Sequence, residues 1–146
     1  MFLKVKIKQI EGGTLPAYKR SGDVCMDCYS RIESEIPAFG RKLIPLGFAL
    51  ELPADYEAIV RPRSGLTCGG IDVAIGTIDT NYRGEVKACV INDSPETVLV
   101  EKGDRICQLA IREVPFVSWD VVDTLTETNR GDKGFGSSGV NDKETV

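Results

Sequence analysis

The sequence lacks histidine altogether, in a chain of 146 residues. Histidine is the side chain whose ordinary pKa lies closest to neutrality, and it is also the commonest metal ligand in proteins. Its absence excludes Ser-His and Cys-His catalytic dyads and removes the usual general base. Any hydrolytic chemistry in this chain must therefore use carboxylates, lysine, tyrosine, thiols or a metal ion.

An excess of basic residues is also missing. The chain has 18 Lys and Arg against 22 Asp and Glu, which gives a formal net charge of -4. Proteins that bind a nucleic-acid backbone usually carry a basic patch, so we expect no nucleic-acid partner. Phosphate binding would have to rely on a few placed cations, backbone N–H groups and a metal ion.

Long apolar runs are absent as well. No segment approaches the roughly 20 apolar residues that span a bilayer, and the alternating start of the chain lacks the apolar stretch of a signal peptide. Five cysteines, an odd number, argue against a disulfide framework. We expect a cytoplasmic protein with reduced thiols and no membrane contact, and leave a nuclear or viral context open.

Short alternating segments broken by Gly, Pro, Asn and Asp dominate the chain, a pattern typical of an all-β sandwich or barrel. The expected strands are residues 2–8, 46–52, 56–60, 71–75, 85–91, 97–100, 105–111 and 116–122. In 46–52 the apolar side chains fall on one face. One short helical turn is expected at 64–68, with Ser64 as its cap. We expect one domain, with a β core over 1–125 and a flexible C-terminal arm over 126–146 that carries a glycine-rich motif.

The segment 61–66 follows an expected strand. Ser64 and Gly65 at a helix start would present backbone N–H groups to an anion, and Arg63 would add positive charge. The alternative is a plain turn capped by Ser64, which is the more frequent outcome for so short a motif.

The segment 76–85 lies between two expected strands, and its Asn, Tyr and Gly suit a β-hairpin loop. The exposed backbone of such a loop can read the edge of a base. Asp79 follows the apolar Ile78, so we expect it to be partly buried, where burial raises the pKa of a carboxyl and makes it a usable base. The alternative is a turn aspartate that makes an Asx hydrogen bond.

Gln108 is a polar residue on an otherwise apolar strand. A buried polar side chain costs stability unless it is paired. Two interpretations stay open: Gln108 meets a ligand, or it faces solvent on an edge strand.

The segment 130–139 contains four glycines in ten residues, which gives a backbone able to wrap closely around a phosphate. Phe135 stands between two of these glycines, far from any core segment, and is suited to stack on a ring supplied by a ligand. The alternative is a disordered tail.

Cys25 and Cys28 form a CxxC pair. A zinc site would need two further soft ligands, and a redox motif would need a βαβ context; the sequence indicates neither. We therefore expect buried or half-buried thiols in a strand.

Together these segments resemble the trimeric dUTPase family, in five ordered blocks along nearly the whole chain. The blocks are 21–30 with Asp27, then 62–66, 76–84, 103–109 and 130–139. Each block is a weak or moderate signal, but all five in order at family-like spacing are highly specific. The resemblance implies a jelly-roll-like β-clip fold with one short helix and a C-terminal arm. It also implies a homotrimer with three active sites shared at subunit interfaces.

The implied activity is a magnesium-dependent hydrolysis of dUTP to dUMP and pyrophosphate. It would limit uracil incorporation into DNA and supply dUMP for thymidylate synthesis. By this resemblance, Asp79 deprotonates a water that attacks the α-phosphorus. Asp27 contacts Mg²⁺ through water, in the outer coordination shell of the ion, which agrees with the preference of this ion for waters and phosphates.

The resemblance divides the remaining site residues into two groups. The nucleoside group has backbone that reads uracil, a tyrosine under deoxyribose that excludes a 2′-hydroxyl, and a phenylalanine that covers uracil: Gly76, Thr77, Ile78, Tyr82 and Phe135. The residues that would contact phosphates are Arg63, Ser64, Gly65 and Gln108, together with Arg130, Gly136, Ser137 and Ser138. The last four belong to the fifth block, which would close as a lid from another subunit.

The chain departs from the family pattern at three places. Cys25 replaces the Gly usual before the first-block Asp, Asn81 stands where many members carry Asp, and Lys133 replaces a Gly usual in the fifth block. Asn81 is tolerable because the base would be Asp79. Lys133 would stiffen the lid or add a phosphate contact.

Two competing functions share the expected fold: a dCTP deaminase, and a non-catalytic nucleotide-binding or signalling module. The complete third block with Tyr82 and the Phe-Gly-Ser-Ser tail favour hydrolysis over deamination. The presence of Asp79, Gln108 and the fifth block argues against a decayed site.

Overall fold

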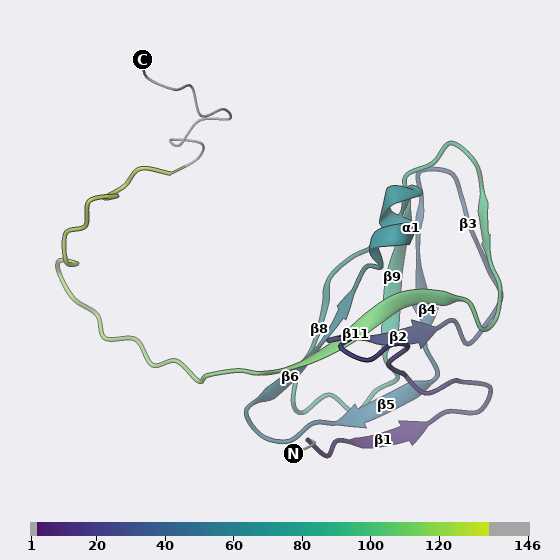
Figure 1. The fold of residues 1–146 in the computed structure, drawn as a ribbon, viewed down its shortest axis with the longest axis horizontal. Helices are drawn as coiled ribbons and strands as arrows, with labels where there is room; N and C mark the ends of the chain where they lie inside the picture. Colours follow the sequence, from purple (N-terminus) through teal and green to yellow (C-terminus); the bar gives the residue numbers. More distant parts are fainter. Residues whose placement is uncertain (1–2, 135–146) are drawn as a thin grey trace. The chain divides into compact units, whose positions relative to one another are not determined.

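The computed structural model describes residues 3–134 (Figure 1). The chain forms two compact units, Met1–Phe116 and Val117–Val146. Every strand and helix of the described residues lies in the first unit. That unit ends at Phe116, inside the segment 1–125 that we expected as the core.

The first unit is almost entirely β-structure, as predicted. One short helix, α1 (Ser64–Cys68), lies between β6 and β7. The strands in chain order are β1 (Lys6–Gln9), β2 (Met26–Tyr29), β3 (Ser34–Ile36), β4 (Arg41–Pro45), β5 (Phe48–Glu51), β6 (Tyr56–Arg61), β7 (Ile71–Val73), β8 (Gly76–Ile78), β9 (Lys87–Asn92), β10 (Val98–Val100) and β11 (Arg105–Glu113).

All strand pairings are antiparallel and fall into four groups. Two larger sheets have the orders β2-β11-β6-β8 and β4-β9-β7, and two ribbons pair β1 with β5 and β10 with β3. In the four-stranded sheet, β8 pairs with β6 through Ala58↔Ile78, Ile59↔Thr77 and Val60↔Gly76. Within the described chain, β8 is therefore an edge strand whose outer side has no strand partner.

Seven of the eight expected strands are present, with ends that differ by a few residues. Cys28 of the CxxC pair lies in a strand, β2, as expected, whereas Cys25 directly precedes that strand. Strands β3, β4 and β8 were not predicted. They are only three to five residues long, and β4 buries only Ile44 fully, so their alternation is too short to stand out in the sequence.

The expected strand at 116–122 is not formed, and that prediction is wrong. Phe116, Trp119 and Val121 are each more than 80% exposed. A strand is held by hydrogen bonds to a neighbour, and this segment pairs with no strand in the described chain. Alternation of apolar residues alone was therefore not sufficient.

The apolar core collects buried side chains from both larger sheets and from both ribbons. Leu46, Phe48, Leu50 and Leu52 are all at most 5% exposed, which confirms that they share one buried face. Burying a side chain of this size contributes about 2 kcal/mol through the hydrophobic effect. The largest fully buried side chains are Phe48, Ile36, Ile44, Leu46, Leu109, Val60, Val86 and Val90.

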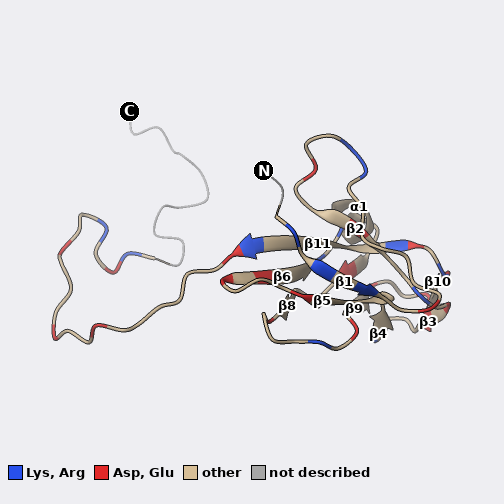
Figure 2. Ribbon diagram, turned by 90° about the horizontal axis from the view of Figure 1, so that it is seen from below, with Lys and Arg blue, Asp and Glu red and all other residues tan. Residues whose placement is uncertain are grey.

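The charged residues are mixed along the described chain. Lys and Arg are interspersed with Asp and Glu on strands and loops (Figure 2). Among the described residues, no helix has the length and apolar character that crossing a membrane requires.

Candidate active site

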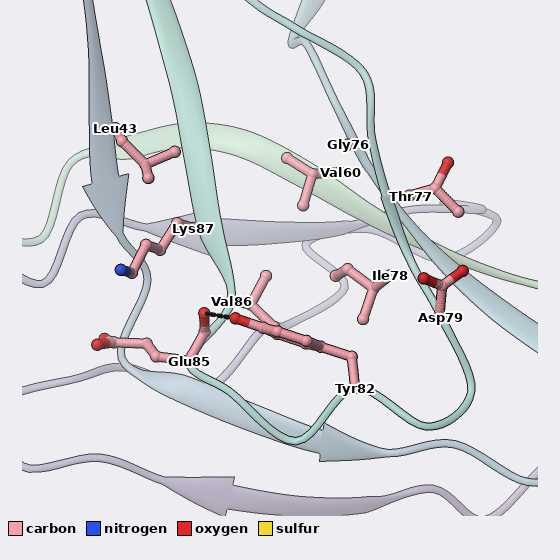
Figure 3. A pocket seen from close by; sticks show the side chains of 10 residues that line it. All are labelled: Leu43, Val60, Gly76, Thr77, Ile78, Asp79, Tyr82, Glu85, Val86 and Lys87. Carbon is pink, nitrogen blue, oxygen red and sulfur yellow. Dashed lines mark hydrogen bonds between the residues drawn. The ribbon is translucent and has the colours of Figure 1, made fainter.

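A pocket of about 300 Å³ lies beside β8 and the loop that follows it (Figure 3). It brings together five residues that the sequence predicted for the nucleoside and the reaction. The lining consists of Leu43, Val60, Gly76, Thr77, Ile78, Asp79, Tyr82, Glu85, Val86 and Lys87. The volume is at the small end of the range for ligand pockets in proteins.

Asp79 directly follows β8, and its side chain is exposed. The expectation that it is partly buried is therefore wrong for the single chain. Side chains alternate along a strand, and because Ile78 points into the core, Asp79 points outward. The turn is closed by the backbone carbonyl of Asp79, which accepts the N–H of Tyr82 at 3.0 Å. The carboxylate is not used as the turn cap.

The loop 79–86 connects two different sheets, because β8 pairs with β6 whereas β9 pairs with β4 and β7. The expected β-hairpin is therefore wrong. The hydroxyl of Thr80 anchors the loop by donating to the carbonyl of Tyr56 at 2.8 Å. Tyr82 folds back over the loop and its hydroxyl donates to the carbonyl of Glu85 at 3.1 Å. The ring of Tyr82 thus becomes one wall of the pocket.

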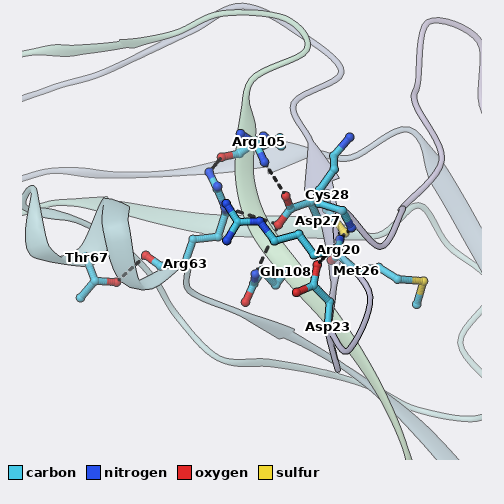
Figure 4. A network of polar contacts seen from close by, with 10 residues as sticks. Arg20, Asp23, Met26, Asp27, Cys28, Arg63, Thr67, Arg105 and Gln108 are labelled. Atoms are coloured by element: carbon cyan, nitrogen blue, oxygen red, sulfur yellow. Dashed lines mark hydrogen bonds and ion pairs between the residues drawn. The ribbon is translucent and has the colours of Figure 1, made fainter.

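A second group of polar side chains surrounds Asp27 on β2 (Figure 4). The carboxylate of Asp27 is buried, and its Oδ2 accepts a hydrogen bond from Arg105 Nη1 at 2.9 Å. Its Oδ1 accepts from Gln108 Nε2 at 3.3 Å and lies 3.5 Å from Arg63 Nε. Arg63 also donates to the carbonyl of Arg105 at 2.7 Å. The fold thereby joins residues of the first, second and fourth sequence blocks.

The position of Gln108 decides whether it lies on an edge strand. Its strand β11 lies between β2 and β6, so Gln108 is not on an edge strand. The interpretation that it merely faces solvent on an edge is wrong. Its amide is instead paired with a buried carboxylate, which removes the cost of a polar side chain there.

Arg105 belongs to this group but was not predicted from the sequence. In a regular strand, residues three apart point to opposite faces, so Arg105 would point away from Gln108. The pairing of β11 with β2 shifts register between Arg105 and Cys107, and such a bulge changes the phase of alternation. Both side chains therefore reach Asp27. The only sequence signal was the place of Arg105 in the fourth block.

The surrounding groups keep Asp27 ionised. Burial by itself raises the pKa of this carboxyl. The hydrogen bonds from Arg105 and Gln108, with the positive charges of Arg63 and Arg105, outweigh burial and hold the pKa below its ordinary value of 3.8. At neutral pH one buried carboxylate thus faces two guanidinium groups, which leaves one positive charge in excess for an anion.

Comparison with known proteins identifies the family. The family model described as dUTPase matches residues 11–139, most of the chain. The chain belongs to the dUTPase family. A deoxyuridine 5'-triphosphate nucleotidohydrolase of Orientia tsutsugamushi (strain Ikeda) is 46% identical over 147 residues, covering 94% of this chain and 99% of that protein. The protein of the same name from Maricaulis maris (strain MCS10) is 43% identical over 146 residues, covering 93% and 96%.

Solved dUTPase structures share the fold. A mutant dUTPase of Staphylococcus bacteriophage 80alpha with dUpNHpp matches with a TM-score of 0.84 at 23% identity, covering 94% of this chain and 99% of that one. A mutant dUTPase from phage phi11 of S. aureus, studied for its structural Mg(II) ion, matches with a TM-score of 0.78 at 17% identity, covering 84% and 98%. The jelly-roll-like β fold expected for a dUTPase is confirmed.

The donor set of this dUTPase-family chain limits how it could bind magnesium. Within residues 3–134, no three His, Cys, Asp or Glu side chains gather in a group able to hold a metal ion. Asp27 is a single carboxylate, and both of its oxygens already accept hydrogen bonds. These residues fit an ion carried mainly by phosphate oxygens and water, which is the usual preference of Mg²⁺.

The predicted phosphate residues of the second block lie at the start of α1. Ser64 and Gly65 are its first two residues, and both are exposed. The N-cap position is occupied by Arg63 without a side-chain cap bond, so the predicted capping by Ser64 is wrong. Ser64 is already inside the helix and its hydroxyl does not cap it.

The fifth block of the dUTPase pattern is only partly described. Arg130 lies in the second compact unit, where its Nε donates to the carbonyl of Lys133 at 3.0 Å. The other predicted residues of this block lie outside the described residues: Phe135, Gly136, Ser137 and Ser138.

The two groups of site residues are separate within one chain. Neither Arg63 nor Gln108 lines the pocket that contains Tyr82. The fold therefore forms one pocket around residues of the third block and a cationic group around Asp27 from the first, second and fourth blocks, without merging them in one pocket.

The cysteines are free thiols. Cys28 is fully buried in β2 and Cys25 is half-buried just before it, as expected. Cys28 is the register partner of Cys107. A hydrogen bond with Cys107 and burial raise the pKa of Cys28 far above its usual range, so Cys28 is a protonated thiol in the core.

Proposed function

We propose that this chain hydrolyses dUTP to dUMP and pyrophosphate. Membership of the dUTPase family supports the reaction. The single observation that carries the proposal at residue level is the pocket that places Asp79 and Tyr82 at the end of the edge strand β8. Such a reaction limits uracil incorporation into DNA and supplies dUMP for thymidylate synthesis.

Gly76, Thr77 and Ile78 would recognise the base through their backbone. The outer side of β8 has no strand partner within the described chain, so its N–H and C=O groups are available to a ligand. Uracil presents an N–H between two carbonyl oxygens, a pattern that a strand edge can match. Cytosine would leave groups unpaired at the same edge, and an unpaired buried group is heavily penalised. Tyr82 would pack under the deoxyribose and exclude a 2′-hydroxyl.

Asp79 would act as the general base. Its carboxylate accepts a proton from a water molecule, and the water oxygen attacks the α-phosphorus in line. The bond between the α-phosphorus and the bridging oxygen breaks, and pyrophosphate leaves. The exposure of Asp79 in the single chain leaves it accessible to both water and substrate.

Arg63, Ser64, Gly65 and Gln108 would bind the phosphates. The excess positive charge around Asp27 supports this role. Arg63 and Gln108 are held by a buried carboxylate before substrate arrives, so little reorganisation is needed on binding. The fifth block would close over the nucleotide, with Arg130, Gly136, Ser137 and Ser138 at the phosphates and Phe135 over uracil.

Magnesium would be bound by the triphosphate and water, with Asp27 in its outer coordination shell. When bound, the ion neutralises phosphate charge and orients the triphosphate. Asp27 would receive hydrogen bonds from the waters of the ion in addition to those from Arg105 and Gln108.

A homotrimer with shared active sites would combine the two groups of residues. In one chain the Tyr82 pocket and the Asp27 group are not joined, which supports a site completed by neighbouring subunits. Mixing inactive Asp79→Asn chains with chains that lack Gln108 tests this arrangement. Recovery of activity in mixed oligomers is expected if the two residues act from different chains.

Pyrophosphate release from dUTP, UTP, dTTP and dCTP, with and without Mg²⁺, tests the proposed function. Fast release from dUTP alone, with magnesium, is the expected result. Deamination of dCTP would identify a deaminase instead. Nucleotide binding without pyrophosphate release by a folded oligomer would identify a non-catalytic module.

A further inference from the structure

Glu85 connects three separate segments of the chain at the back of the Tyr82 pocket. Its Oε1 accepts hydrogen bonds from Arg31 Nε at 2.7 Å and from the backbone N–H of Gly47 at 3.0 Å. Its Oε2 accepts from Arg31 Nη2 at 3.1 Å. The guanidinium thus holds the carboxylate through two parallel bonds, the strongest geometry for this kind of pair.

The surroundings of the pair fix both partners. The side chains of Arg31 and Glu85 are only 28% and 17% exposed. The N–H of Arg31 donates to the carbonyl of Pro45 at 3.0 Å. Gly47 has φ +80, and a Cβ there would lie 3.2 Å from Cδ of Arg31, so the guanidinium stem packs directly on this turn. The pair is therefore part of the folded frame and not a contact between freely moving surface side chains.

The same residue holds Tyr82 through its backbone. The Tyr82 hydroxyl donates to the carbonyl of Glu85 at 3.1 Å, while the carboxylate of Glu85 points away from the ring (Figure 3). The ring also lies directly on Gly84, where a Cβ would be 2.5 Å from Cζ of Tyr82. The position of the ring thus depends on the position of the Glu85 peptide.

Val86 reinforces this connection. Its N–H donates to the carbonyl of Phe48 at 2.9 Å, and its carbonyl accepts the N–H of Leu46 at 3.0 Å. The end of the loop 79–86 is therefore tied to the turn between β4 and β5 by two backbone bonds, beside the Glu85 bond to Gly47. Glu85 lies between Tyr82 and this tie: its carbonyl accepts the Tyr82 hydroxyl, and its carboxylate is held by Arg31.

We propose that Arg31 and Glu85 are positioning residues that set the height of the Tyr82 ring in the nucleoside pocket, and so determine the discrimination between dUTP and UTP. This inference rests on the proposed function. The pair acts through Tyr82 and does not touch the reacting atoms. Its loss should therefore affect sugar selection much more than the chemical step on dUTP.

Three variants test the proposal: Arg31→Lys, Glu85→Gln and their combination. Arg31→Lys keeps the charge but loses the bidentate geometry, and Glu85→Gln keeps the shape but loses the charge. In each, the ratio of kcat/KM for dUTP to that for UTP should fall at least about tenfold, while kcat for dUTP stays within about threefold. The double variant should fall little further, because both changes break one interaction.

Glu51→Gln is the matched control. It removes the carboxylate that pairs with Lys6, whose Nζ lies 2.7 Å from Oε1 of Glu51. The side chains of Glu51 and Lys6 are 47% and 80% exposed. Exposed pairs contribute little, so this variant should keep the wild-type ratio. Thermal unfolding of all variants identifies any that fail to fold, and Arg31→Lys is the mildest of the set.

Hydrogen exchange of the amides in 79–86, measured without nucleotide, provides a second readout. Faster exchange confined to this loop is expected in the Arg31 and Glu85 variants. Wild-type discrimination together with wild-type exchange would overturn the proposal. A wild-type protein without dUTP hydrolysis would overturn the proposed function, and the exchange data would then still decide whether the pair holds the Tyr82 loop.

Discussion

Asp27 and Gln108 are directly opposed across β2 and β11, and the amide of Gln108 donates to Oδ1 of the carboxylate at 3.3 Å. The two residues are 81 positions apart in the chain and come from different sequence blocks. The pairing explains how a buried carboxylate is tolerated, since both of its oxygens have partners. It also fixes the side chain of Gln108 in the proposed phosphate site.

Asp27→Asn should alter the dependence of stability on pH. The folded pKa of Asp27 lies below its ordinary value of 3.8. The ionised group therefore stabilises the folded chain above that value, and this contribution is lost as the pH falls toward the folded pKa. In urea unfolding without magnesium, the wild type should lose stability below about pH 4 more steeply than the variant.

At pH 7 the Asp27→Asn variant should be less stable by about 2 kcal/mol, because Arg63 and Arg105 lose their counter-charge. Asp93→Asn, which changes an exposed aspartate directly after β9, serves as the control and should follow the wild type. If the free energy of unfolding fell identically with decreasing pH in the wild type and in Asp27→Asn, the assignment of this carboxylate as a stabilising ion would be contradicted.

Asp79→Asn should abolish turnover while leaving dUTP binding nearly intact. The amide has nearly the shape of the carboxylate but does not accept a proton from water, so we expect kcat to fall by about 10³-fold or more. Single-turnover assays and calorimetric binding with a non-hydrolysable analogue separate the two effects. Full activity in this variant would remove Asp79 from the role of base.

Much of the fold could be predicted from the sequence, because apolar and polar residues alternate in most strands and glycine-rich segments mark the breaks between them. The segment 116–122 shows the limit: its alternation has no partner strand in the described chain, so pattern alone gave the wrong answer. Asp79 shows a second limit: its burial depends on which face of β8 its side chain takes, and the sequence did not reveal that Ile78 points into the core and Asp79 outward. Arg105 shows a third, because a bulge reverses the face that a side chain takes, and only pairing with β2 reveals it.

Truncation after Thr128 should leave a folded protein with greatly reduced activity. The compact unit Met1–Phe116 contains every strand of the described chain, so its thermal unfolding should stay cooperative. The truncation removes Arg130 and the rest of the fifth block, and a loss of about 10²-fold in kcat/KM for dUTP is expected. A chain ending at Gly139 is the matched control, because it keeps the block and should retain activity. Equal rates for both truncations would disprove the lid.

Gly84→Ala should relax the discrimination between dUTP and UTP. A methyl group at Gly84 would lie 2.5 Å from Cζ of Tyr82 and closer still to the hydroxyl, so the ring must move and its bond to Glu85 must break. We expect the ratio of kcat/KM for the two nucleotides to fall about tenfold. In a Tyr82→Ala background the same change should have no further effect, because there is no ring to displace. Additive effects of the two substitutions would show that Gly84 acts through the backbone of the loop and not through the position of Tyr82.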